Sequence, residues 1–281
     1  FSLLKEKSIP LPPLEEQKKI AYVLSVVQSA EEKVENLINA LKEFKKSMMK
    51  HLFTYGAVSF QDREKRELKE TEIGLIPREW EVVRLGEVLY EIDVRVRDFE
   101  EESTYKLPVL SLTKNEGLVL QAERFRKRIA TEDVSQYKVV YRGQIVYNPY
   151  VIWEGAVHIL DRYEAGLVSP VYLVWKVKEN KAYAWFIDPL LRMPNAMNAY
   201  SRFASGAVNR RRAIRKNDFL SIPIPLPPLE EQKRIADILS AIDEYIEKAQ
   251  MKRQALRELF KRLLKDLMTA KIRVKHINIE E

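Results

Sequence analysis

Two stretches of the chain share one pattern of apolar and polar positions, and each predicts a long amphipathic helix. Apolar residues alternate at steps of three and four from Ile20 to Leu52, and again from Ile235 to Leu267. Such spacing places apolar side chains on one narrow stripe of a helix, which is typical of a coiled-coil seam. A long helix cannot bury that stripe by itself, so we expect the two helices to pair. The expected seam residues are Leu24, Val27, Leu41, Met48, Leu239, Ile242, Leu256 and Leu263.

The same motif precedes both helices. Ile-Pro-Leu-Pro-Pro-Leu-Glu-Glu-Gln-Lys occurs at residues 9–18 and again at residues 224–233, and many later positions match as far as Thr54 and Thr269. Prolines favour an extended entry segment and are excluded from helix interiors, whereas glutamates in a first turn suit the positive end of the helix dipole. The motif therefore predicts where each helix begins, and its recurrence identifies an internal repeat.

The paired helices are expected to be antiparallel, because the segment between them must return to its starting point. Glu31 and Arg253 interrupt the apolar stripes, which predicts imperfect pairing. The alternative is two independent amphipathic helices that each cap one globular core.

Residues 68–222 predict a mixed α/β domain, so the fold class is α+β, with one such domain flanked by two long helices in an antiparallel coiled coil. The remaining boundaries are a tail at 1–10, a first helical region at 11–63 and a second at 223–281. Turn signals separate the β-rich stretches. These stretches are residues 107–112, 118–120, 144–147, 156–160 and 171–177, and residues 182–192 predict a short helix.

Composition favours a polyanionic partner and excludes several kinds of chemistry. The net charge is +7, and residues 189–217 contain seven basic residues and no acidic one. The chain has no cysteine, and its three histidines, His51, His158 and His276, are far apart, so we expect neither disulfides nor a metal centre. No apolar run is long enough to span a membrane and no signal peptide is evident, so a cytoplasmic location is expected.

Several polar and aromatic residues are candidates for binding DNA, because cations bind phosphates whereas Arg, Asn and Gln read base edges. They lie at a predicted hairpin tip, in a loop after a strand and in two basic clusters. The candidates are Lys114, Asn115, Arg124, Arg126, Arg128, Asn148, Tyr150, Trp153, Asn209, Arg210, Arg211, Arg212 and Arg215. The alternatives are that the basic clusters are solvated faces or pair with the acidic stretch near residue 100, and that Trp153 packs in the core. His158, in an apolar strand, is expected to be packed or hydrogen-bonded.

Catalytic chemistry is not indicated. Asn148-Pro149-Tyr150 is one proline short of the motif that positions adenine in amino-methyltransferases, and the eight glycines form no cluster that would hold S-adenosylmethionine. A turn after a strand explains Asn148-Pro149. Residues 100–102 are three successive glutamates, which we interpret as a solvated loop rather than a metal site.

The doubled Pro-Leu-Pro-Pro-Leu-Glu-Glu-Gln-Lys motif resembles the conserved regions of type I restriction–modification specificity subunits. Residues 71–80, their continuation Val83-Arg84-Leu85-Gly86, and the stretch from Ser205 to Pro223 resemble the opening and closing segments of the target recognition domains of that family. The resemblance covers nearly the whole chain. It implies that residues 68–222 form a target recognition domain that reads double-stranded DNA.

In that family a subunit holds two recognition domains, each reading half of a split site, and its helices dock methyltransferase and restriction subunits. This chain has one such domain, and residues 1–8 resemble the tail of an earlier one, which predicts a fragment or a half-sized form. No cofactor and no catalytic residue are expected. The competing hypotheses are a structural coiled-coil adaptor that does not read DNA and an autonomous DNA methyltransferase.

Overall fold

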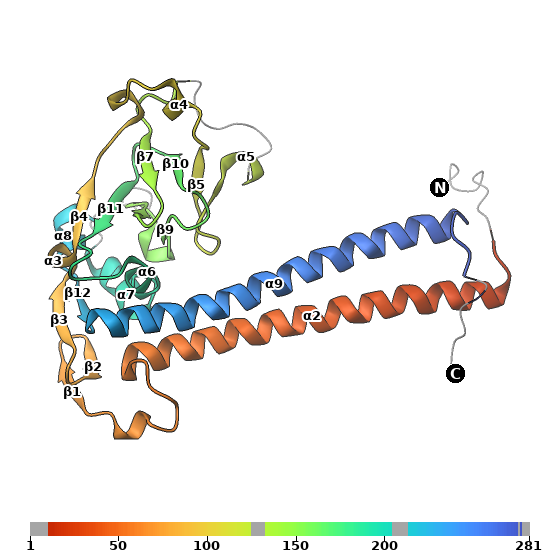
Figure 1. Cartoon of the computed structure of the whole chain (residues 1–281), viewed down its shortest axis with the longest axis horizontal. Helices are drawn as coiled ribbons and strands as arrows, with labels where there is room; N and C mark the ends of the chain where they lie inside the picture. The colour runs from red at the N-terminus through yellow and green to blue at the C-terminus, as the bar shows by residue number, and fades with distance from the viewer. Residues whose placement is uncertain (1–10, 125–132, 204–212, 275, 277–281) are drawn as a thin grey trace. The chain divides into compact units, whose positions relative to one another are not determined.

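The computed structural model describes residues 11–124, 133–203, 213–274 and 276, and the chain divides into two compact units. The first unit consists of residues 1–49 and 238–281, and the second of residues 50–237. Two long helices, α2 (Leu14–Tyr55) and α9 (Leu229–Met268), each contribute residues to both units (Figure 1).

The first unit is a pair of antiparallel helices, as the apolar spacing predicted. Residues 14–49 of α2 lie beside residues 238–268 of α9, which runs in the opposite direction (Figure 1). Val34, Ile38 and Ala249 are buried between the two helices, and Leu41 and Leu256 pack against them. Pairing of the stripes therefore buries the apolar side chains, which excludes the alternative of two independent capping helices. The other expected seam residues are buried, as are Leu239 and Ile242, or half-buried, as are Leu24, Val27, Met48 and Leu263.

The polar residues that interrupt the stripes form ion pairs between the two helices. Glu31 pairs with Arg257 at 2.5 Å, and Arg253 pairs with Glu35. A third pair, Lys45–Asp243, joins the helices at 2.5 Å. Hydrogen bonding to Arg253 lowers the pKa of the Glu35 carboxyl, and hydrogen bonding to Glu31 raises the pKa of Arg257. Ion pairs between two helices fix which residues of one helix face which residues of the other. Glu31 and Arg253 therefore help to set the register of the helix pair, although they interrupt the apolar stripes.

The start of α2 shows a second role for the repeated motif. The Gln17 side chain donates a hydrogen bond to the Pro12 carbonyl at 2.7 Å. Glu16 is buried, and its carboxylate accepts two hydrogen bonds from Arg273, at 2.6 and 2.5 Å. The sequence pattern assigned the paired glutamates to the helix dipole alone, but the second glutamate also serves as a buried ion-pair partner.

The second unit is built on an antiparallel sheet in the order β4 (Leu89–Ile92), β11 (Leu173–Val177), β8 (Ile145–Tyr147) and β9 (Val157–Ile159). Trp175 of β11 lies opposite Glu91 of β4 and Ile145 of β8. On the same face, Phe219 packs against the rings of Tyr147 and Trp175, with centroids 4.5 and 5.6 Å apart. Aromatic packing therefore holds the chain after residue 213 on the sheet.

Four two-stranded antiparallel ladders and several short helices complete this unit. The ladders pair β1 (Leu68–Thr71) with β2 (Gly74–Pro77), β3 (Glu81–Arg84) with β12 (Pro223–Leu226), β5 (Leu110–Leu112) with β6 (Leu118–Leu120), and β7 (Lys138–Tyr141) with β10 (Ala165–Val168). The helices are α3 (Leu85–Val88), α4 (Glu102–Tyr105), α5 (Gln121–Arg124), α6 (Ala184–Leu190), α7 (Pro194–Phe203) and α8 (Lys216–Leu220), with 3-10 turns η1 (Arg63–Lys65), η2 (Val96–Asp98) and η3 (Ile152–Glu154). The α+β fold class is confirmed.

The five β-rich stretches expected from the sequence each contain a strand, and the expected short helix is α6. Strands β5, β8, β9 and β11 are shorter than the expected stretches, whereas β6 has the expected bounds. Helices α7 and α8 were not expected. Pro194 begins α7, a position that proline favours.

Glu231, in the second copy of the motif, joins the start of α9 to the opening of the α/β domain. Its carboxylate is buried and accepts hydrogen bonds from the Trp80 indole at 3.0 Å, the Ala57 amide at 3.1 Å and the Arg66 guanidinium at 3.0 and 3.1 Å. Gly56, with φ of +81°, brings the chain so close that an added Cβ would lie 2.2 Å from this carboxylate.

The neighbouring Gln232 is fully buried and contacts main-chain atoms. Its amide oxygen accepts a hydrogen bond from the Tyr183 N–H at 2.8 Å, and its amide nitrogen donates to the carbonyls of Lys181 and Pro227 at 3.2 and 2.8 Å. The motif therefore fastens the helix start to this domain as well as predicting where the helix begins.

Candidate nucleic-acid interface

Three segments of the second unit lie next to one another and carry candidate DNA-binding residues. The first is the hairpin tip between β5 and β6, residues 113–117. The second is the Asn148 loop, residues 148–155, which follows β8 and contains η3. The third is the α8 leader, residues 213–215, which immediately precedes α8. These segments are far apart in sequence, and only the fold brings them together.

Contacts on both sides of the Asn148 loop join the three segments. Lys114 of the hairpin tip forms an ion pair with Glu154 of the loop. Gly155 lies close to the same tip, since a Cβ added to it would be 3.7 Å from the Lys114 carbonyl oxygen. On the other side, the Ile214 N–H donates a hydrogen bond to the Pro149 carbonyl at 3.2 Å. The loop therefore lies between the hairpin tip and the α8 leader.

The hairpin tip is a compact turn that exposes its two candidate residues. The Thr113 hydroxyl donates to the Gly117 carbonyl at 3.0 Å and accepts from the Glu116 N–H at 2.8 Å. Gly117 has φ of +72°, a conformation that glycine adopts without strain. Lys114 and Asn115 are exposed, as expected for a hairpin tip.

The Asn148 loop is closed by its own first residue. The Asn148 side-chain oxygen accepts a hydrogen bond from the Tyr150 N–H at 3.1 Å, and the Asn148 N–H donates to the Ala156 carbonyl at 3.1 Å. This is the turn after a strand that the sequence suggested. Tyr150 is 46% exposed, whereas Trp153 is half-buried in η3, against which α7 packs. The ring of Tyr150 is therefore accessible to a ligand, whereas part of the Trp153 ring is covered by packing.

The basic run at residues 189–217 is less available than its sequence suggested. Arg192 is bound bidentately by Asp188, at 2.7 Å for both oxygens, and Lys216 pairs with Glu91 at 2.5 Å. Both acids lie outside the run, so the sequence count did not include them. Arg215 is exposed at the end of the α8 leader. Two of the seven basic residues, Arg192 and Lys216, are therefore paired with acids, the first with Asp188 and the second with Glu91.

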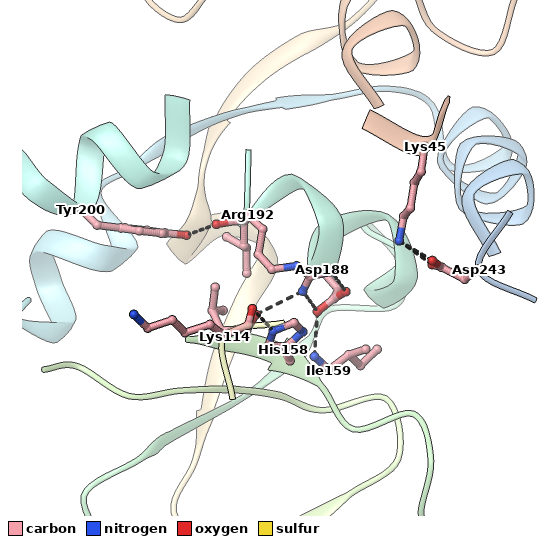
Figure 2. A network of polar contacts seen from close by, with 10 residues as sticks. Lys45, Lys114, His158, Ile159, Asp188, Arg192, Tyr200 and Asp243 are labelled. Carbon is pink, nitrogen blue, oxygen red and sulfur yellow. Dashed lines mark hydrogen bonds and ion pairs between the residues drawn. The ribbon is translucent and has the colours of Figure 1, made fainter. Parts of the chain in front are cut away.

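A buried polar network lies behind the hairpin tip and the Asn148 loop. Asp188 accepts hydrogen bonds from the Ile159 N–H and from Arg192, and one ring nitrogen of His158 lies 3.1 Å from the Lys114 carbonyl oxygen. Figure 2 shows His158 among Lys114, Ile159 and Asp188. Burial by itself raises the pKa of a carboxyl, but the charge of Arg192 and the hydrogen bonds from Arg192 and the Ile159 N–H more than offset it, so the pKa of Asp188 lies below its usual range. His158 is packed and hydrogen-bonded, as expected.

The remaining candidates are placed only in part. Arg124 is the last residue of α5, a helix that packs against β5 and β6. The candidates outside the described residues are Arg126, Arg128, Asn209, Arg210, Arg211 and Arg212. Sequence reasoning missed Glu154, the acidic partner of Lys114, and it had no signal for this pair because the contact depends on how the hairpin and the loop pack.

Within the described ranges no three histidine, aspartate or glutamate side chains are grouped so that they could hold a metal ion. The helices of the same ranges include none that is both long and apolar enough to cross a membrane.

Comparison with known proteins identifies relatives along nearly the whole length of the chain. Residues 1–60 and 77–257 match the model of the type I restriction modification DNA specificity domain. Two similar proteins come from Methanocaldococcus jannaschii. The MjaX specificity subunit is 34% identical over 97% of this chain, and the type I restriction enzyme MjaVIII specificity subunit is 32% identical over 96%. This chain spans 61% and 63% of their lengths.

A solved structure shares the fold at low sequence identity. The type I restriction–modification system S subunit from M. genitalium matches with a TM-score of 0.56 and 16% identity, over 95% of this chain and 65% of that one. Because the family model covers well over half of the sequence, the chain belongs to the family of type I restriction modification DNA specificity domains.

Proposed function

We propose that this chain is a DNA sequence-recognition subunit of a type I restriction–modification system, that it reads one half of a bipartite target, and that it does no chemistry itself. The observation that carries the proposal is the meeting of the hairpin tip, the Asn148 loop and the α8 leader. Together they present a cation, an amide and an aromatic ring from distant parts of the sequence. Such a set can bind phosphates and read base edges.

The exposed residues of the interface have distinct roles in this proposal. Asn115 is exposed at the hairpin tip, and an asparagine amide can bind an adenine edge through two hydrogen bonds. Lys114 and Arg215 contact phosphates, for which Lys114 must exchange Glu154 for the backbone of DNA. Tyr150 packs its exposed ring against sugar or base. The arginines at 210–212 extend the phosphate contacts.

The helix pair is the proposed docking surface for the methyltransferase and restriction subunits. Both helices expose large apolar side chains, which a docked subunit would cover. On α2 these are Leu14, Tyr22, Val26, Leu37 and Phe44, and on α9 they are Tyr245, Met251, Leu259, Leu264 and Met268. The expected cytoplasmic location, where such partners would meet it, stays a prediction.

Co-expression with a methyltransferase subunit tests the proposal most directly. The subunits should co-purify, and sequencing of the methylated DNA should give one recurrent site. Loss of that site in the Asn115→Ala variant, with co-purification intact, would assign readout to the hairpin tip. Methylation without a recurrent site would contradict the proposal.

Salt dependence of binding separates the competing functions. Replacing Arg210, Arg211 and Arg212 with alanine should weaken binding to all duplexes and reduce the slope of log affinity against log salt by about 3. The matched control replaces three exposed lysines of the helix pair, Lys18, Lys46 and Lys261. A shallow slope for the parent chain would favour the adaptor, and binding of S-adenosylmethionine by the chain alone would favour a methyltransferase.

A further inference from the structure

We infer that His158 is a positioning residue for DNA readout: its buried imidazole holds the main chain of the hairpin tip, so that Asn115 is presented in one conformation. This inference rests on the proposed function, because it names what positions the proposed reader. His158 does not contact DNA in this scheme. It acts through the Lys114 carbonyl.

The contact fixes the protonation of one ring nitrogen. The Nε2 atom of His158 lies 3.1 Å from the Lys114 carbonyl oxygen, and a carbonyl oxygen can only accept a hydrogen bond. Nε2 therefore carries a hydrogen and donates it. His158 is only 8% exposed, so water competes poorly for this bond.

The imidazole also supports the tip by packing. Gly117, at the other end of the tip, lies against the His158 ring, since an added Cβ would be 3.7 to 3.9 Å from three ring and side-chain atoms. One side chain thus contacts both the second and the last residue of the five-residue tip. The tip's own hydrogen bonds, from Thr113, close the turn but do not attach it to the rest of the domain.

The imidazole is in turn attached to rigid structure. His158 is the central residue of β9, where it lies opposite Val146 of β8. The adjacent Ile159 N–H donates to Asp188 at 2.7 Å, and Asp188 is held by Arg192, which also donates to the Val157 carbonyl at 3.1 Å. Each main-chain neighbour of His158 is therefore bonded to the Asp188–Arg192 pair. A side chain that reads a base is most selective when the main chain that carries it is rigid, because the side chain then cannot adjust its position to bind a wrong base.

Histidine NMR of the unmodified full-length chain tests the contact without any variant. The chain has only three histidines, so the imidazole nitrogens of His158 can be assigned by elimination with His51→Gln and His276→Gln. The inference requires a protonated Nε2. A neutral ring with its hydrogen on Nδ1 would overturn it.

Two matched variants then separate the hydrogen bond from the packing. His158→Phe keeps a ring and loses the donor, whereas His158→Gln loses the ring and keeps a donor. In His158→Phe, amide hydrogen exchange at residues 114–117 should accelerate about fivefold, the ratio that corresponds to one hydrogen bond. His158→Gln should restore part of the protection. Wild-type exchange in the Phe variant would overturn the inference.

DNA binding supplies the functional readout. The probes are a duplex carrying the site found by methylation sequencing and an equally long duplex with that half-site scrambled. His158→Phe should reduce the ratio of the two affinities about fivefold and leave affinity for the scrambled duplex unchanged, because cations set the latter. An equal loss on both duplexes would overturn the positioning role.

Asn115→Ala distinguishes failure of this inference from failure of the proposed function. If that variant keeps the wild-type affinity ratio, the hairpin tip does not read DNA, and the proposed readout fails together with the role of His158 in it. If Asn115→Ala lowers the ratio and His158→Phe does not, the proposed function stands and the inference is wrong.

Discussion

Replacing Glu231 with glutamine should destabilise the α/β domain far more than the same change one residue earlier. The Glu231 carboxylate is only 7% exposed and receives the Trp80 indole, the Ala57 amide and the Arg66 guanidinium. Glutamine has the same shape but offers one oxygen in place of two, and its amide group would face N–H donors. The change therefore removes a charge and leaves donors without an acceptor.

The magnitude follows from these contacts. Breaking one side of a buried ion pair costs about 3 to 5 kcal/mol, and leaving a buried donor unsatisfied costs about 1 to 3 kcal/mol. Arg66 keeps a second partner, Glu79 at 2.6 Å, which places the expected loss at the lower end. We expect Glu231→Gln to lower the free energy of unfolding by about 3 kcal/mol.

Tryptophan fluorescence in a denaturant titration measures this loss selectively, because all four tryptophans lie in the second unit. The control is Glu230→Gln. Glu230 is 81% exposed and pairs with Lys233 three residues later, so its loss should be below about 0.5 kcal/mol. Equal losses in the two variants, or a loss below about 1 kcal/mol for Glu231→Gln, would refute the reasoning.

Three further predictions concern single residues. Gly56→Ala should lower the free energy of unfolding by about 3 kcal/mol in the same titration, because φ is +81° and the new Cβ meets a carboxylate. The control Gly74→Ala, where φ is +106° and the space around it is open, should lose only about 1 kcal/mol from backbone strain. Asp188→Asn should lower stability near pH 7. Because the pKa of Asp188 is lowered in the folded state, its contribution to stability is present above the unfolded pKa and is lost as pH falls. The difference in unfolding free energy between the variant and the parent chain should therefore shrink below about pH 4. A difference that persists below that pH would contradict the prediction. Glu154→Gln releases Lys114 and should raise affinity for any duplex about threefold at low salt, and a decrease would argue against a phosphate contact.

The long helices could be predicted because their information is local and repeated. Spacing of apolar residues determines a seam, and the proline-rich motif determines where each helix begins. The roles of Glu16 and Glu231 could not be predicted in the same way. Their partners, Arg273 and Trp80, are distant in sequence, and nothing in the motif distinguishes a glutamate that faces the dipole from one that is buried.

The candidate interface was predicted in its parts but not as an arrangement. Turn signals placed Lys114 and Asn115 at a hairpin tip and Asn148 after a strand. That these segments adjoin depends on the packing of β5, β6 and β9, which has no local signature. The count of basic residues was misleading for Arg192, because its partner Asp188 lies one residue outside the run that was counted.

The contacts of Gln232 have a consequence for exchanging recognition domains. Among the described residues, this side chain binds main-chain atoms of Lys181, Tyr183 and Pro227, and every amino acid except proline supplies both the amide N–H and the carbonyl group. The sequence at 181–183 can therefore vary without loss of these bonds. A foreign recognition domain grafted between the helices would need the same main-chain course at residues 181–183 and a tryptophan at position 80. The residues that bind the target DNA could differ.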